Sequence, residues 1–247
     1  MSPYCSDVMC LDRSIFSDVP GGWNMLRCES GTERIRIRFI KEPFCGLSHL
    51  AGAVISLAGL IVLLVLARGQ PWQTVSFAIY GTCLILLFTA SGLSHSIRCS
   101  TEREGLLDRL DYAAIFLLIA GTYTPICLVN LRGPWGWSLF AAEWTLAIIG
   151  VCTVLVRRWQ ANRIRVMVYL LMGWLVLIAV PVMVNAFPPG AIAWLIAGGL
   201  VYSIGAIVYL SDRPHLWPGR FHAHDLWHSM VLIGSACHFI VMARYVA

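Results

Sequence analysis

The chain has 247 residues, of which 58% are apolar and only 13% are charged. Soluble domains carry about 25% charged residues, so this composition excludes an ordinary soluble domain and is typical of a protein that crosses a membrane several times. The net charge of +5 does not indicate a nucleic-acid-binding protein, because the basic residues lie in short clusters between long apolar runs.

Uncharged stretches of about 20 residues predict membrane-spanning helices. We expect seven of them, over residues 48–67, 74–97, 110–129, 135–156, 166–184, 191–210 and 225–245. The fifth and sixth come from one long uncharged run, which residues 185–190 divide because two prolines and a glycine favour a turn there. The predicted fold is therefore an all-α, seven-helix membrane bundle over residues 42–247, preceded by an N-terminal tail of residues 1–41.

The position of the single lysine excludes one class of seven-helix protein. The only lysine, Lys41, precedes the first apolar run. A retinal Schiff base requires a lysine inside the bundle, so the chain is not a rhodopsin.

Nine cysteines lie at positions 5, 10, 28, 45, 83, 99, 127, 152 and 237, without a CxxC pair. We therefore expect neither a disulfide framework nor a thiolate metal site.

The distribution of basic residues predicts the orientation of the bundle. Of the 18 lysines and arginines, 15 lie in the N-terminal segment or in the loops after the second, fourth and sixth helices, and 3 lie on the other side. Basic residues are enriched in cytoplasmic loops. We therefore expect a cytoplasmic N-terminus and an outward-facing C-terminus.

Four ionisable residues are predicted at one depth near the cytoplasmic ends of three helices. His95 ends the second helix, Asp111 begins the third, and His224 and His228 share one face at the start of the seventh. Ser91 lies one turn deeper than His95 on the same helix. Ionisable residues within membrane spans are expensive to bury and are usually functional.

Three imidazoles beside a carboxylate form a set of residues that suits a metal ion. Three neutral histidines bind Zn²⁺ and leave a fourth position for water. Asp111 would either ligate the metal directly or hold that water. The alternative is that these side chains hydrogen-bond only to one another and to lipid headgroups.

Four further polar residues are interpreted separately. His49 opens the first helix at the same depth, where it suits hydrogen bonding to a metal ligand. Asp108 is expected to be solvated, and His238, deeper in the seventh helix, to be a packed histidine with satisfied hydrogen bonds. Glu143, in the middle of the fourth helix, is either protonated and hydrogen-bonded or part of a cavity lining.

Three segments resemble signatures of the hemolysin III family, which is related to the adiponectin and progestin receptors. These are Ser-Gly-Leu-Ser-His at 91–95, Leu-Asp-Tyr-Ala-Ala-Ile at 110–115 leading into Ala-Gly-Thr-Tyr-Thr-Pro at 120–125, and Phe-His-Ala-His-Asp-Leu-Trp-His at 221–228. The resemblance covers residues 42–247. Tyr112 departs from it, since bacterial members often have histidine there.

This resemblance implies a bundle that holds zinc at its cytoplasmic side. The ligands would be His95, His224 and His228, with Asp111 positioning the water on the metal and Ser91 completing the surroundings. The wider superfamily includes alkaline ceramidases, which hydrolyse a lipid amide, and the family name comes from a haemolytic activity.

Three functions are therefore considered. The first is a zinc-dependent hydrolase of a membrane lipid amide or ester, with Asp111 as the general base and Ser91 as a donor to the oxyanion. The second is a receptor or sensor of the membrane state in which zinc has a structural role. The third is a cytolysin, which is disfavoured as a monomeric pore because the outer halves of the helices show no polar face.

Overall fold

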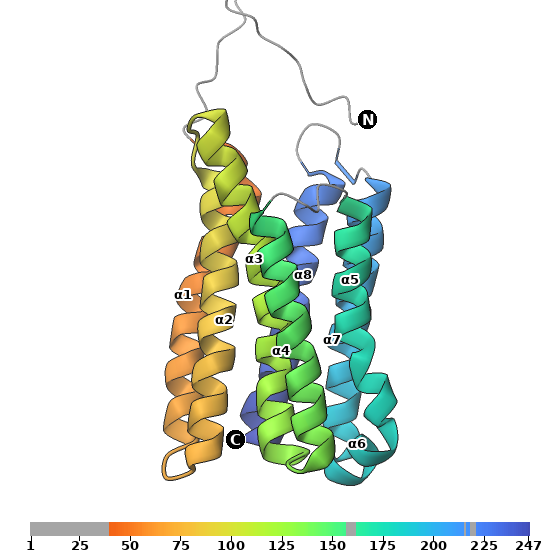
Figure 1. The fold of residues 1–247 in the computed structure, drawn as a ribbon. Coiled ribbons are helices and arrows are strands. Elements are labelled where there is room, and N and C mark those ends of the chain that lie inside the picture. Colours follow the sequence, from red (N-terminus) through yellow and green to blue (C-terminus); the bar gives the residue numbers. More distant parts are fainter. Residues whose placement is uncertain (1–39, 157–161, 215, 218–220) are drawn as a thin grey trace, which may run out of the picture. The chain divides into compact units, whose positions relative to one another are not determined.

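The computed structural model describes residues 40–156, 162–214, 216–217 and 221–247. Almost all of the predicted tail, residues 1–39, lies outside the described residues. Within the described ranges, seven helical segments are long and apolar enough to cross a membrane. The predicted all-α, seven-span fold is confirmed (Figure 1).

The helices follow one another with short connections. They are α1 (Pro43–Leu66), α2 (Pro71–Ser96), α3 (Thr101–Pro125), η2 (Ile126–Asn130), α4 (Pro134–Leu155), α5 (Asn162–Trp174), η3 (Leu175–Ala179), α6 (Val180–Ala186), α7 (Pro189–Ser211), α8 (Ala223–Val241) and η4 (Met242–Val246). Here η3 is a 3-10 helix, and η2 and η4 are π-helical ends of their spans. Proline begins α1, α2, α4 and α7, because its missing N–H costs nothing in the first turn.

The third span begins earlier than its apolar stretch. The prediction started it at residue 110, whereas α3 begins at Thr101. Glu102 and Glu104 lie in its first turn, where acidic side chains interact favourably with the helix dipole. Hydropathy does not detect such charged turns, although they are helical.

The fifth span is not the single continuous helix that was predicted for residues 166–184. It consists of α5, the 3-10 segment η3 and the short helix α6. Pro181 lies in the first turn of α6 and cannot donate a backbone hydrogen bond to the preceding turn. The Tyr123 hydroxyl bonds the backbone at this interruption: it donates to the Met172 carbonyl at 2.9 Å and accepts from the Val176 amide at 2.9 Å.

The third helix is at the centre of the bundle. In the span Thr101–Asn130, 67% of the most apolar stretch is buried inside the protein, against 22% in the span of α1. The most extensive helix pairs are α1 with α2, α2 with α3, α7 with α8 and α3 with α4. Apolar side chains exposed on the outer helices, such as Ile55 and Leu171, face the region that lipid would occupy.

The two ends of the bundle differ in chemistry. The end where α1, α3 and α8 begin carries His95, His224 and His228, and we call it the histidine end. The chain finishes at Ala247 at the opposite end, as seven spans require (Figure 1).

Candidate metal centre and cavity

The three histidines predicted as ligands are neighbours. His95 comes from the end of α2, and His224 and His228 come from the first two turns of α8. Ring centroids are 4.5 Å apart for His95 and His228, 5.1 Å for His95 and His224, and 4.6 Å for His224 and His228. The i,i+4 spacing on α8 brings the two Nε2 atoms of His224 and His228 within 3.1 Å.

Asp111 and Ser91 lie beside this histidine cluster. The Oδ2 atom of Asp111 is 3.7 Å from Nε2 of His95, and the carboxylate is buried. Ser91 is also buried, one turn from His95 on α2, and it lines the same cavity as the histidines. All five predicted site residues therefore line one cavity at the histidine end.

A carboxylate that the sequence interpretation missed, Glu42, contacts two of the histidines. Its Oε2 atom lies 2.7 Å from Nδ1 of His95 and 3.5 Å from Nε2 of His224. Its backbone amide donates to the His95 carbonyl at 2.8 Å. The hydrogen bond with His95 is the main cause that holds the pKa of the Glu42 carboxyl below its usual value.

Lys41, the residue before Glu42, contacts α2 and α3 at the edge of the histidine cluster, which we call the rim of the site. Lys41 forms an ion pair with Glu104 of α3, with its Nζ atom 3.3 Å from Oε2. Its backbone amide donates to the Ser96 carbonyl at 3.3 Å. The segment that leads into α1 is therefore fastened across the end of α2 and the first turn of α3.

Cys45 is a second residue that the sequence interpretation missed. Two sets of side chains could hold a metal ion: Cys45 with His224 and His228, and Glu42 with His95 and His224. In each set the possible ligand atoms lie within 4.8 Å of one another. The Cys45 thiol donates to Oδ1 of Asp225 at 3.1 Å. Ligation by Cys45 would require the thiolate, and therefore the loss of this hydrogen bond to Asp225.

His49 makes the contact with the ligand set that its depth suggested. Its Nε2 atom lies 3.0 Å from Nδ1 of His228, and the ring is buried between His228 and Phe88. A partner on Nδ1 orients an imidazole, so His49 is placed to direct Nε2 of His228 toward His224.

The expectations for Asp108 and Glu143 need correction. Asp108 is not simply solvated, because it accepts a hydrogen bond of 2.6 Å from the Ser94 hydroxyl. Glu143 is fully buried, yet neither carboxylate oxygen has a hydrogen-bond partner among the described residues, and it does not line the cavity. The structure therefore shows neither the hydrogen bond nor the place in this cavity lining that was expected of Glu143.

Arg165 and Tyr112 form a further contact at the histidine end. Arg165 is one of the basic residues assigned from the sequence to the loop after the fourth predicted helix. In the structure it lies inside α5, is buried, and places its guanidinium 3.6 Å from the centre of the Tyr112 ring. Tyr112 is also the position at which the sequence departs from the resemblance, and its aromatic ring forms this cation–π contact.

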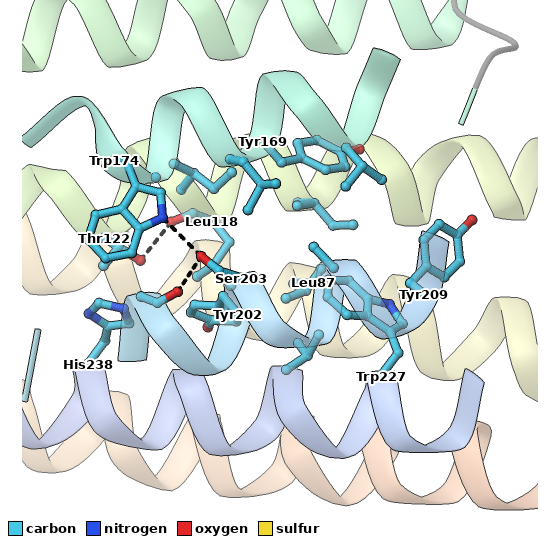
Figure 2. A pocket seen from close by; sticks show the side chains of 18 of the residues that line it. Leu87, Leu118, Thr122, Tyr169, Trp174, Tyr202, Ser203, Tyr209, Trp227 and His238 are labelled. Atoms are coloured by element: carbon cyan, nitrogen blue, oxygen red, sulfur yellow. Dashed lines mark hydrogen bonds between the residues drawn. The ribbon is translucent and has the colours of Figure 1, made fainter. Parts of the chain in front are cut away.

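One cavity of about 450 Å³ connects the histidine cluster with the middle of the bundle. This volume falls in the usual range of small-molecule sites. Figure 2 shows Tyr169, Tyr209 and Trp227 toward one end and a second polar group around His238 toward the other, with Leu87 between them. The lining residues come from the segment before α1 and from every span except α4.

The fold and the site define a seven-helix membrane protein with a histidine and carboxylate cluster at one end of an internal cavity. The family model described as "Haemolysin-III related" matches residues 37–239. The chain belongs to this family.

Curated relatives agree with this assignment. The chain is 39% identical over 212 residues to "Hemolysin-3" of Bacillus cereus, an alignment that covers 85% of this chain and 94% of that protein. It is 36% identical over 209 residues to "Hemolysin-3 homolog" of Bacillus subtilis (strain 168), which covers 83% and 95%. A more distant relative is "Adiponectin receptor protein" of Drosophila melanogaster, 25% identical over 213 residues, covering 78% and 48%.

Proposed function

We propose that this protein is a zinc-dependent hydrolase of a membrane lipid amide or ester. The observation that carries the proposal is the position of the histidine cluster: it lies at one end of a cavity whose middle is lined by apolar side chains such as Leu87, Leu118 and Val231. An amphiphile would fit with its polar group at the histidines and its chain in the apolar part.

The histidine nitrogens suit zinc as ligands, both in chemical type and in spacing. Three imidazoles are a common ligand set for catalytic zinc, which keeps a fourth position open. The Nε2 atoms of His224 and His228 are 3.1 Å apart, close to the roughly 3.4 Å separating two nitrogens that bind zinc tetrahedrally at about 2.1 Å. His95, 4.5 Å from His228 between ring centroids, would supply the third nitrogen.

Residues of this chain would carry the remaining steps. When bound, zinc makes water acidic enough to attack near neutral pH and polarises the substrate carbonyl. Asp111 would accept a proton from the attacking water and deliver it to the amine or alcohol as the bond from the carbonyl carbon to nitrogen or oxygen breaks. The Ser91 hydroxyl would donate to the carbonyl oxygen as negative charge develops there.

The orientation belongs to the same proposal. In the sequence, most arginines lie in the N-terminal segment or close to the ends of the spans that form the histidine end, so that end would face the cytoplasm, with the N-terminus inside and the C-terminus outside. The two Bacillus relatives suggest the plasma membrane of a bacterium as its location.

The names of the relatives suggest two alternative functions. "Hemolysin-3" suggests a cytolysin, and "Adiponectin receptor protein" suggests a receptor in which zinc would hold α2 and α8 together. The cavity of about 450 Å³ favours the hydrolase over a pore, and the Asp111 carboxylate 3.7 Å from His95 favours it over a receptor with structural zinc, because a structural metal site requires no base.

Metal analysis and turnover test the proposal together. Purified full-length protein should contain about one zinc per chain and should release fatty acid from one member of a panel of ceramides, N-acyl amines and phospholipids. The control is the Asp111→Asn variant, which keeps the shape of the side chain but removes the base. Zinc-loaded wild-type protein that hydrolyses no member of the panel, but lyses red cells or vesicles, would favour the cytolysin instead.

A further inference from the structure

The end of the cavity remote from the histidine cluster carries a second group of polar side chains. Figure 2 shows them gathered around one point of the wall: Thr122, Trp174, Tyr202, Ser203 and His238. We call this group the distal polar group. His238 is ten residues beyond His228 on α8, which places it about 15 Å further along the helix axis. No step of the proposed hydrolysis uses these residues.

Most members of the distal polar group are hydrogen-bonded within the protein. The Trp174 indole donates to the Ser203 hydroxyl at 2.9 Å, and Ser203 donates to the Gly199 carbonyl at 2.7 Å. The Tyr202 hydroxyl pairs with the Ser235 hydroxyl at 2.8 Å. These bonds hold α5, α7 and α8 together around the end of the cavity and fix the positions of its polar atoms.

His238 differs from the others in its hydrogen bonding. Its Nδ1 atom is buried without a partner among the described residues. The ring stacks on Tyr202 at a centroid distance of 5.7 Å and an interplanar angle of 14°. It also packs against Gly198, where a Cβ atom would lie only 2.7 Å from Nε2. Packing contacts therefore hold this ring in place, whereas the sequence predicted satisfied hydrogen bonds.

A buried imidazole nitrogen without a partner is costly, so a group that enters the cavity and bonds it gains affinity. A neutral imidazole has one donor and one acceptor nitrogen. Protein atoms cover Nδ1 of His238 in the structure, and a half-turn of the ring about χ2 would exchange its two edges beside the cavity that it lines. A hydroxyl also donates and accepts one bond each, whereas a methylene group does neither. Ser203 and Tyr202 offer further oxygens at the same place.

We propose that the distal polar group is a subsite for a hydroxyl group partway along the acyl chain of the bound lipid. The inference rests on the proposed function in one respect, namely that a lipid chain occupies the cavity, and it names the substrate class as lipids with a hydroxylated acyl chain. The polar head would lie at the histidine cluster, the first part of the chain along Leu87, Leu118 and Val231, and the hydroxyl at His238.

Two fatty acids that differ by one group provide the test. Oleic and ricinoleic acid have the same chain length and the same double bond, and only ricinoleic acid carries a mid-chain hydroxyl. Binding of each to zinc-loaded full-length protein in detergent is measured by competition with a fluorescent fatty acid, so no turnover is required. We expect ricinoleic acid to bind about threefold to tenfold more tightly, the usual worth of one hydrogen bond.

Variants assign this preference to His238. His238→Phe keeps an aromatic ring beside Tyr202 but removes both nitrogens, so it should bind the two acids equally, with oleic acid affinity unchanged. His238→Gln restores a donor and an acceptor and should recover part of the preference, which a merely structural role would not produce. His222→Phe, the same type of change at a histidine outside the cavity, should leave the preference intact.

The outcomes separate this inference from the hydrolase proposal. Equal binding of the two acids by the wild type, or a preference that survives in a folded His238→Phe protein, overturns the subsite and leaves the hydrolase standing. A clear preference for ricinoleic acid in a protein that hydrolyses no lipid supports the subsite and defeats the hydrolase. Binding of neither acid overturns the subsite, and the turnover assay alone then decides the hydrolase. If His238→Phe does not fold, the preference for ricinoleic acid is measured in two other variants, His238→Gln and Gly198→Ala. The methyl group of Gly198→Ala would displace the His238 ring and should abolish the preference.

Discussion

Glu42 accepts a hydrogen bond from Nδ1 of His95, with 2.7 Å between the two heavy atoms. The carboxylate belongs to the segment before α1, and the histidine to the last turn of α2. A carboxylate on Nδ1 fixes the tautomer of an imidazole and leaves Nε2 as the metal-binding atom. In this structure that Nε2 atom lies 3.7 Å from Asp111.

Glu42→Gln should therefore weaken zinc binding without abolishing it. Loss of a carboxylate that orients a ligand typically lowers metal affinity about 10- to 100-fold. Competition with a zinc-specific chelator measures this affinity in purified protein. Glu104→Gln is the matched control, because it removes the same charge from the same rim but contacts Lys41 instead of a histidine. Equal affinity of Glu42→Gln and wild type would show that His95 is oriented without Glu42.

The histidines themselves should be needed for the metal. His95→Ala and His228→Ala should each lose most of the bound zinc, measured by elemental analysis. They should also lower the melting temperature, because metal binding free energy contributes to the stability of the folded state. The double variant His224→Ala/His228→Ala is the most severe test, and full zinc content in that protein would refute the site.

Asp111 and Ser91 should separate a catalytic from a structural zinc. Asp111→Asn should keep zinc but lower turnover by about 10²–10⁴, the usual contribution of a general base. Ser91→Ala should cost less, about 10–10³, as one donor to the oxyanion. Both comparisons require equal expression in the membrane. A zinc-loaded Asp111→Asn protein with wild-type activity in every assay would defeat the hydrolase proposal.

The orientation can be tested by labelling single cysteines in intact cells. A membrane-impermeant reagent should reach cysteines introduced at Gly133 and at Ala247, and should not reach those at Glu104 or at Arg163. Gly133 and Glu104 lie at opposite ends of the spans that adjoin them. Labelling at Arg163 without lysis would reverse the topology and place the histidine end outside.

Glu143 should tolerate an amide but not a shorter side chain. An ionised carboxylate without a partner is far more costly in apolar surroundings than a neutral one, so we expect the protonated acid. Glu143→Gln has nearly the same shape and no charge, and its melting temperature should stay within a few degrees of wild type. Glu143→Ala leaves a cavity in a well-packed core and should destabilise the protein by about 2–4 kcal/mol. A lower melting temperature for Glu143→Gln than for Glu143→Ala would contradict this explanation.

Hydropathy predicted the number of spans, and residue spacing predicted that the five candidate site residues lie near one another. The i,i+4 spacing brought His224 and His228 together, and their depth matched that of His95 because each lies at a helix end. Glu42 and Cys45 could not be found in this way, because their positions depend on how the start of α1 packs against α2 and α8. The interruption of the fifth span had a local signal, Pro181, which hydropathy alone does not register.

The ion pair of Lys41 at the rim of the site has a practical consequence. Because the chain contains no other lysine, an amine-reactive fluorophore can attach to only one side chain, apart from the N-terminal amine. That side chain is fastened to α3 by Glu104, next to the carboxylate that contacts His95. Chemical modification of the natural sequence therefore places a reporter beside the histidine cluster, without any engineered residue.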